Sequence, residues 1–429
     1  MSYYIKTGVD FSTLRKYINA MSFKDYGLAL CKFIALVPFA SLFFMPIFSR
    51  LDWNILNEAP NFYIALLGAL IAAKSFISRI KVRDVVIFLI IAFFFYISPL
   101  IYPLSARFIE EKYVSFVWMV IPFYFVGKMI DFQRDKTLLL IIARLGFVFQ
   151  ILYQVFASMG YFSLADGNDD YSNEQMGIAY GFLFCVMYEL VYGIAYNSKF
   201  DRFLSLLGIV LVLFMGARGP VVTLLVFIVG FFLYFYKFKS YQTFKRLLLV
   251  TIGIVVYFFM NPILLGLSFV SQSLGLSTRV LDSILVNEFI NYQESNGRDD
   301  IYQDIWIAIQ NDSSGLGYGL GGDRLFTSHV YAHNFEMEIL VSFGLYIGGF
   351  LLLALFYIFL KCVLKIKDSD TCAFWFCLFC FGFLPIQFSG TWINSPEFFL
   401  LLGYSLSLLN LDGARGICSR NKYSYEKRY

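Results

Sequence analysis

The amino-acid sequence predicts an all-α integral membrane protein, and three observations lead to this fold class. Hydrophobic residues make up 59% of the 429 residues, aromatic residues 20%, and charged residues only 15%. The apolar residues gather in runs of about 20, which is the length of an α-helix that crosses the hydrocarbon core of a bilayer. Polar residues gather between these runs. We therefore treat residues 1–429 as a single polytopic membrane domain.

The order of the apolar runs predicts about twelve membrane-spanning helices. The first run follows a polar segment and has no small-residue cleavage signal after it, so we expect a retained helix and not a signal peptide. Polar or basic segments separate each of the next runs from its neighbour. The first six predicted helices cover residues 28–48, 59–78, 84–104, 113–131, 138–160 and 176–196.

Two sequence features divide the apolar segments of the second half. Residues 203–236 are too long for one helix, and Gly216-Ala217-Arg218-Gly219-Pro220 predicts a turn within them. Near the C-terminus, Thr391-Trp392-Ile393-Asn394-Ser395-Pro396 predicts the tip of a helical hairpin, because Pro and Asn end helices readily. The remaining predicted helices cover residues 203–216, 220–236, 247–266, 335–360, 372–392 and 397–411.

The distribution of Lys and Arg predicts that both termini face the cytoplasm, because the cytoplasmic flanks of spans are enriched in these residues. With the N-terminus inside, the inner loops contain most of the basic residues, including those at 79–83 and 361–367. The long polar segment 266–334 then faces outward, and we expect short amphipathic helices in it. The outer side contains only Arg50, Arg107, Lys112, Arg218, Arg279, Arg298 and Arg324.

The cysteine and acidic residues do not indicate a disulfide or a metal site. All seven cysteines lie in predicted spans or on the inner side, and Cys377 and Cys380 are expected to be core residues of an apolar helix. We interpret Asp368-Ser369-Asp370 as a solvated charge pair and residues 166–170 as an acidic outer loop. The sequence therefore predicts no metal and no other cofactor.

Lys32, Arg144 and Glu189 are ionisable residues within predicted spans. Lys32 and Arg144 are close enough to the cytoplasmic ends of their helices to extend their charged groups to the membrane surface. Glu189 lies deeper in its span, so we expect it to pair with a basic residue in the bundle; a proton-coupling role is the alternative.

Arg218 lies at the predicted helix break on the outer surface, next to Gly216, Gly219 and Pro220. An arginine near hydrocarbon is costly unless an anion or a water-filled cavity receives it. The neighbouring glycines allow a ligand to approach the backbone. We interpret Arg218 as an anion-binding residue, with an anchor among lipid head groups as the alternative.

Arg298 follows Asn296-Gly297 and precedes a segment that reads as an amphipathic helix, which contains Tyr302. A guanidinium at the start of such a helix can donate two parallel hydrogen bonds to phosphate oxygens, and it does not lose its charge by deprotonation. This residue is a second candidate for anion binding. An exposed ion pair with a neighbouring aspartate is the alternative interpretation.

Both histidines of the protein, His329 and His333, lie in the outward segment. They follow a glycine-rich turn at residues 315–322, which lacks the Lys-Ser/Thr of a nucleotide-binding P-loop. We expect this turn to pack flexibly against a lipid-borne substrate. His333 precedes Asn334 and the next span, and an imidazole in this position can accept a proton from a sugar hydroxyl. A purely structural histidine is the alternative.

Three motifs, in this order on a scaffold of about twelve spans, resemble the O-antigen polymerase and ligase superfamily of bacterial envelope glycan synthesis. They are Ala217-Arg218-Gly219, then Asn296-Gly297-Arg298 ahead of Trp306, and then Gly315-x-Gly317-x-Gly319 leading to His333-Asn334 and Gly344-Leu345. The resemblance covers roughly residues 200–350. Ala217 stands where this family usually has Ser or Thr, so the local hydrogen bonding beside Arg218 is expected to differ.

The resemblance implies a GT-C-like, metal-independent glycosyltransferase that acts on undecaprenyl-pyrophosphate-linked oligosaccharides at the periplasmic face of the bacterial inner membrane. It also implies that Arg218 and Arg298 hold the pyrophosphate and that His333 is the general base. The expected partners are the lipid-linked oligosaccharide, membrane lipids and a chain-length regulator, but no nucleic acid. We assign further substrate contacts to Arg324, Tyr302, Asn334, Gly317 and Gly319.

Within this superfamily we favour a polymerase over a ligase, which transfers glycan to the lipid A core. The Phe- and Tyr-rich composition of the chain resembles the diverse polymerases more than the ligases. The main alternative from another class is a flippase or transporter of lipid-linked sugars. Such transporters tend to have repeated halves and helices broken near the midplane, and no internal repeat is visible in this sequence.

Overall fold

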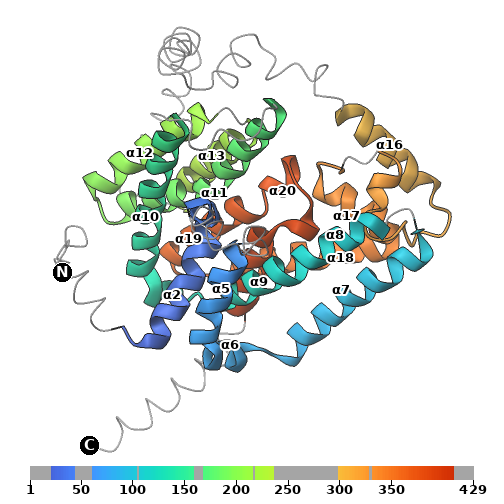
Figure 1. Ribbon diagram of the computed structural model, residues 1–429, viewed down its shortest axis with the longest axis horizontal. Helices are drawn as coiled ribbons and strands as arrows, with labels where there is room; N and C mark the ends of the chain where they lie inside the picture. Colours follow the sequence, from blue (N-terminus) through green and yellow to red (C-terminus); the bar gives the residue numbers. More distant parts are fainter. Residues whose placement is uncertain are drawn as a thin grey trace, which may run out of the picture.

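The computed structural model describes residues 21–43, 60–103, 106–158, 168–215, 218–235, 298–327 and 331–409. Helices account for most of these residues, and no strand occurs among them (Figure 1). The all-α membrane class is therefore confirmed. Five helices in this part are long and apolar enough to cross a membrane: Val82–Ile101, Phe132–Phe156, Met176–Ala195, Phe335–Lys365 and Ser369–Phe388. The total of about twelve spans remains a prediction, and the predicted span at 247–266 lies outside the described residues.

The N-terminal helices include one close helix crossing. They are α2 (Phe23–Leu36), α5 (Pro60–Ile71), α6 (Ala73–Arg79), α7 (Val82–Ile101), α8 (Ala106–Ser115) and α9 (Ile121–Met129). Helices α2 and α5 cross at glycines, because a Cβ on Gly27 would lie only 2.8 Å from the Gly68 carbonyl oxygen. Small residues at a crossing let two helix backbones approach closely, which improves packing in a membrane.

The C-terminal helices confirm two predicted turns. The helices are α10 (Phe132–Ser158), α11 (Asn168–Ala195), α12 (Lys199–Phe214), α13 (Arg218–Gly230), α16 (Arg298–Asn311), α17 (Phe335–Phe343), α18 (Gly349–Lys365), α19 (Ser369–Gly382), α20 (Pro385–Phe388) and a last helix at Pro396–Leu409. Helix α12 ends four residues before α13 begins, as the glycines and proline of the predicted break indicate. The predicted hairpin tip contains a 3₁₀ turn at Trp392–Asn394. The predicted acidic loop at 166–170 differs in its second half, because α11 already begins at Asn168.

Aromatic side chains fill the contact between α11 and α19. The rings of Phe374 and Phe132 are stacked with their centres 4.8 Å apart, and Tyr188 meets the Phe374 ring edge-on at 5.8 Å. Cys377 and Cys380 lie fully buried in the same helix, as predicted for core residues. Aromatic pairs of this kind contribute about 0.5–1.5 kcal/mol beyond the burial of their area, so this contact stabilises the centre of the bundle.

Buried ion pairs mark one end of the bundle, which we call the basic end. Lys32 of α2 donates to Asp135 at the start of α10, over a distance of 2.5 Å. Lys128 at the end of α9 donates to Asp84 at the start of α7, and the Tyr124 hydroxyl donates to the same carboxylate at 2.6 Å. Asp84 and Asp135 lie at the predicted inner starts of their helices and Lys128 at the predicted inner end of α9, so these pairs lie on the predicted inner side of the bundle.

The expectation that Lys32 extends to the membrane surface is wrong. Its side chain is only 4% exposed, because the Asp135 carboxylate receives the charge inside the bundle. The Arg144 side chain, in contrast, is 31% exposed; it donates to Asp201 at 2.6 Å, with Glu189 at 3.9 Å from its Nε. The predicted pairing of Glu189 with a basic residue is therefore confirmed. Burial of Lys32 and Asp135 is tolerable because each charge is matched by the other, whereas the Arg144 guanidinium is shared by the two buried carboxylates of Asp201 and Glu189.

The opposite end of the bundle contains the hairpin turn, and we call it the hairpin end. Met176 begins the apolar part of α11 and Tyr180 follows one turn later, whereas Glu189 lies near the other end of the helix. The Met176 sulfur is 3.8 Å from the Ser389 hydroxyl, which directly follows α20. A Cβ on Gly219 would overlap the Tyr180 hydroxyl, so the start of α13 also lies at this end.

Candidate functional site

A rigid turn at residues 312–321 forms the base of the candidate site. Its shape depends on left-handed backbone at glycines, with φ of 79° at Gly317 and 80° at Gly319. Such angles suit glycine because it has no Cβ to clash. The Asp312 carboxylate accepts from the Gly317 amide at 2.7 Å and from the Ser314 hydroxyl at 2.6 Å. Burial raises the pKa of Asp312, but these hydrogen bonds outweigh it and hold the pKa below its ordinary value.

The turn is fixed to two helices. The Gly319 amide donates to the Ser342 carbonyl of α17 at 2.9 Å, and the Tyr102 hydroxyl, just after α7, donates to the Gly317 carbonyl at 2.9 Å. The Leu320 amide also donates to the Ser98 hydroxyl of α7 at 3.0 Å. The structure therefore shows Gly317 and Gly319 holding a firmly packed turn where the sequence predicts a flexible one. Their contact with a substrate remains a prediction.

Arg324 and His333 lie in one aromatic cluster that follows this turn. The Arg324 guanidinium carbon is 3.8 Å from the centre of the Phe108 ring and 5.8 Å from that of Tyr331. The centres of the Tyr331 and His333 rings are 3.9 Å apart. Aromatic faces attract the guanidinium electrostatically, which orients it without neutralising its charge. Tyr331 thus places a permanent cation and an imidazole on the same small patch of the surface.

The backbone of His333 is held in an uncommon conformation. Its φ is +51°, a left-handed value that few non-glycine residues adopt. The Tyr302 hydroxyl of α16 donates to the His333 carbonyl at 3.4 Å. Asn334 then caps α17 by accepting from the Met337 amide at 2.9 Å, which is the role that Asn favours before a helix. Substrate contact by Asn334 remains a prediction.

Two buried carboxylates support this region, and neither is among the site residues predicted from the sequence. Asp323, only 1% exposed, accepts from the Ala332 amide at 2.9 Å and so fixes the segment before His333. Burial raises the pKa of Asp323 above its ordinary value. Glu338 of α17 accepts from the Thr391 hydroxyl and from the Trp392 amide, the latter at 3.3 Å. Glu338 is an acidic residue within an apolar predicted span, and this feature of the sequence could have indicated that its side chain is buried and hydrogen-bonded to the hairpin.

Arg218 is the first residue of α13, and its side chain is exposed at the hairpin end. The first turn of a helix carries partial positive charge from its free amides. An arginine there adds to this positive potential, so the position favours a bound anion. Helix α20 contacts both α13 and α17, and therefore links the helix that begins with Arg218 to the helix that follows His333.

Arg298 begins α16, but its side chain lies outside the described residues, as do Asn296, Gly297 and His329. Tyr302 follows Arg298 by four positions, so both residues belong to the same face of α16. This helix packs against α17 through Ile305 and Ala308, which are buried against Val341. The backbone at Arg298 is thus part of the helix that contacts the His333 segment.

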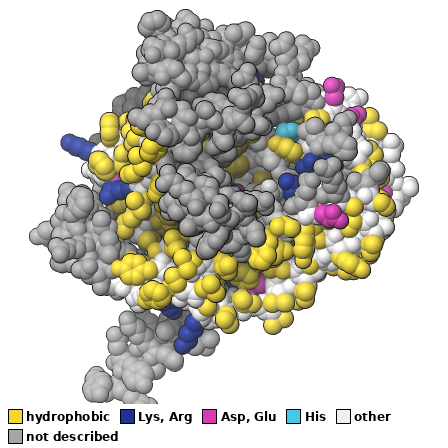
Figure 2. Space-filling view, in the orientation of Figure 1, with side chains coloured by type: hydrophobic (Ala, Val, Ile, Leu, Met, Phe, Trp, Pro, Cys, Tyr) yellow, Lys and Arg dark blue, Asp and Glu magenta, His cyan; other side chains and the backbone are white. Residues whose placement is uncertain are grey.

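The structure brings Tyr302, Arg324, His333 and Asn334 together and places Arg218 at the same end of the bundle. Figure 2 shows a histidine near basic side chains on one face, beside residues that are not described. Among the described residues, no group of three His, Cys, Asp or Glu side chains could hold a metal ion. Asp368, part of the predicted charge pair, accepts from the Thr371 amide at 2.8 Å and caps α19.

Comparisons of the chain with protein-family models, curated proteins and solved structures found no match.

Proposed function

We propose that the protein is a polysaccharide polymerase, which joins undecaprenyl-pyrophosphate-linked oligosaccharide units at the outer face of a bacterial inner membrane. The observation that carries this proposal is the cluster of Arg324, Tyr331 and His333 at the end of the bundle where α13 begins with Arg218. This end therefore combines cations for an anionic leaving group with a group that can accept a proton.

The chemistry of the reaction explains why such a combination is useful. Breaking the bond between an anomeric carbon and pyrophosphate develops negative charge on the leaving group. Cations held in position before the reaction stabilise this charge without a reorganisation cost. In the proposal, Arg218 and Arg298 bind the pyrophosphate, and Arg324, oriented by the Phe108 ring, provides further positive potential.

His333 acts as the general base in the proposed reaction. It removes the proton from the attacking sugar hydroxyl while the new glycosidic bond forms and the pyrophosphate leaves with the electrons of the broken bond. A base must be held within hydrogen-bond reach of the proton that it accepts. The Tyr302 and Asp323 hydrogen bonds support this role, because they fix the backbone on both sides of the imidazole.

Reconstitution tests the proposal directly. The purified chain is placed in liposomes with lipid-linked repeat units extracted from cells that lack its gene, without nucleotide or ion gradient. A ladder of longer lipid-linked glycans supports the polymerase. Transfer of one glycan to an added lipid A core acceptor, without a ladder, supports the ligase alternative. Movement of the units across the bilayer without any new glycosidic bond contradicts both enzymes and supports a transporter.

A further inference from the structure

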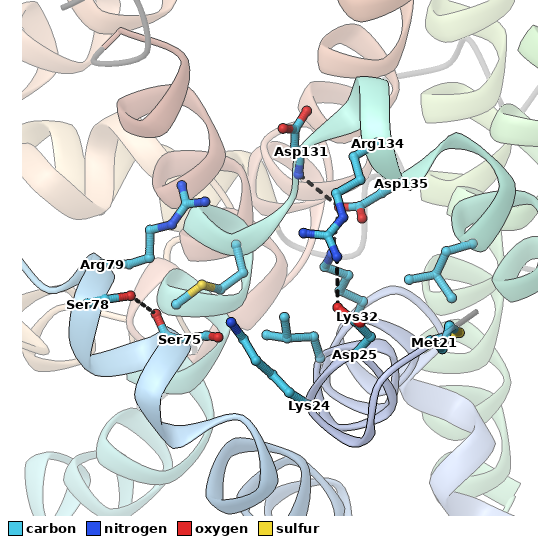
Figure 3. A pocket seen from close by; sticks show the side chains of 13 residues that line it. Met21, Lys24, Asp25, Lys32, Ser75, Ser78, Arg79, Asp131, Arg134 and Asp135 are labelled. Atoms are coloured by element: carbon cyan, nitrogen blue, oxygen red, sulfur yellow. Dashed lines mark hydrogen bonds and ion pairs between the residues drawn. The ribbon is translucent and has the colours of Figure 1, made fainter. Parts of the chain in front are cut away.

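A polar cavity of about 270 Å³ lies at the basic end of the bundle. It is bounded by the beginning of α2, by α6, and by the residues that join α9 to α10 (Figure 3). In Figure 1, α6 lies at the lower edge and α16 at the upper right, so this cavity is separate from the candidate glycan site. Four cationic side chains line it: Lys24, Lys32, Arg79 and Arg134.

Two of these cations are already neutralised within the protein. Lys32 donates to Asp135 at 2.5 Å, and Arg134 donates to Asp25 at 2.7 Å. Both carboxylates also accept hydrogen bonds from the chain, Asp135 from the Asp131 amide at 2.8 Å and Asp25 from the Ser22 hydroxyl at 2.6 Å. These two acidic groups therefore have little capacity left for a further cation.

The other two cations, Lys24 and Arg79, are exposed and have no ion-pair partner among the described residues. They belong to different elements, α2 and α6, and Figure 3 shows them on the walls of the same cavity. The remaining carboxylate in the lining, Asp131, points away from this part of the cavity in Figure 3. The cavity therefore has unmatched positive charge on its Lys24 and Arg79 side.

Ser75 provides an independent indication of a ligand. Its side chain is only 8% exposed and lines the cavity, and its hydroxyl has no hydrogen-bond partner among the described residues. The Ser75 carbonyl, in contrast, accepts from the Ser78 hydroxyl at 2.9 Å. A buried hydroxyl without a partner costs free energy, and such groups usually bind water or a ligand.

We propose that this cavity binds a phosphate-bearing anion, which Lys24 and Arg79 contact from α2 and α6 while the Ser75 hydroxyl donates a hydrogen bond. Phosphate oxygens accept several hydrogen bonds at once and match an ammonium, a guanidinium and a hydroxyl. The anion is either the head group of an acidic phospholipid or soluble phosphate. Basic pockets between helices near the membrane surface are typical sites for such head groups.

Two probes distinguish the sources. Inorganic phosphate is titrated into the full-length protein in uncharged detergent by calorimetry, and phosphatidylglycerol retention is measured by native mass spectrometry after exchange into mixed micelles with phosphatidylcholine. Saturable phosphate binding with no preference for phosphatidylglycerol supports a soluble anion. Selective retention of phosphatidylglycerol supports a lipid head group. Binding of neither probe overturns the proposal.

Variants locate the binding in this cavity. Lys24→Ala and Arg79→Ala are each expected to weaken binding by about fivefold, the effect of removing one basic residue from a lipid-facing site. Ser75→Ala is expected to weaken it less. Lys74→Ala is the matched control, because Lys74 is an exposed lysine of the same helix that does not line the cavity. Equal affinity in Lys24→Ala, Arg79→Ala and the control would overturn the assignment, whatever the protein does to glycans.

Discussion

The Tyr302 hydroxyl donates a hydrogen bond of 3.4 Å to the backbone carbonyl of His333, whose φ is +51°. This contact joins α16 to the segment before α17. The two bonded residues are 31 positions apart in the sequence. The contact supports a left-handed backbone conformation that few non-glycine residues adopt, although asparagine, aspartate and histidine adopt it more often than the others. The position of the imidazole therefore depends on α16 as well as on its own segment.

Replacement of His333 by asparagine is expected to remove the proposed base and to leave the left-handed backbone conformation intact. His333→Asn keeps a residue that tolerates the left-handed conformation but removes the base, so the protein should fold and extension should fall by about 10²–10⁴-fold, the usual contribution of a general base. Glycan extension by membranes is the measurement, with size-exclusion chromatography as the check on folding. Wild-type extension by a correctly inserted Asn variant would exclude His333 as the base.

Gly219 is expected to be intolerant of a side chain. In Gly219→Ala the new methyl group overlaps the Tyr180 hydroxyl, so the start of α13 must move, at a cost of about 1–3 kcal/mol. Thermal denaturation in detergent should show the loss, and the additional Tyr180→Phe substitution should restore part of it. Gly177→Ala on α11 is the control, because no atom lies within 4 Å of a Cβ there. Equal losses in both alanine variants would contradict the close crossing.

Removal of one member of the buried Lys32–Asp135 pair is expected to destabilise the protein. Lys32→Ala leaves the Asp135 carboxylate buried without its cation, at a cost of about 3–5 kcal/mol, and Lys32→Met with Asp135→Leu should cost less. The more exposed pair of Lys136 and Asp370, at 3.5 Å, should contribute less than about 1 kcal/mol. Chemical denaturation of the variants measures both, and a larger loss for Lys136→Ala would contradict the burial of the first pair.

Asp323 is expected to make stability depend on pH. Burial raises its pKa in the folded protein above the ordinary value of the unfolded chain. Above that ordinary value the unfolded state binds fewer protons than the folded state, so the contribution of Asp323 to stability is present at lower pH and is lost as pH rises through its folded pKa. Asp323→Asn retains an oxygen for the Ala332 amide. It should flatten the pH dependence of the melting temperature between the unfolded and the folded pKa of Asp323. An unchanged slope would contradict the burial effect.

The fold class and several helix boundaries could be predicted from the sequence because they depend on local patterns. Apolar runs identify helices, and the glycines and proline near Arg218 mark a break that the structure confirms. The pairing of Lys32 with Asp135 could not be predicted, because these residues are 103 positions apart and nothing local indicates which helices meet. This missing information explains the wrong expectation that Lys32 reaches the membrane surface.

The sequence indicated candidate residues for the site, but not the contacts between them. The sequence identified His333 and Arg324 as polar residues of one outward segment. It did not indicate that Tyr331 lies between them or that Asp323 anchors the backbone, because those contacts depend on how the turn folds back on α17. The capping role of Asn334, in contrast, follows from its place directly before a helix.

The most direct test of the central claim separates binding from chemistry in two variants. Arg218→Ala should lose both retention of the undecaprenyl-pyrophosphate-linked unit and glycan extension, and Arg218→Lys should recover little, because an ammonium lacks the planar fork. His333→Asn should retain the lipid-linked unit but not extend it. Lys199→Ala, which changes a cation at the start of α12 at the basic end, should behave as wild type in both assays. Normal extension by Arg218→Ala, or loss of retention in His333→Asn alone, would contradict the proposed division of roles.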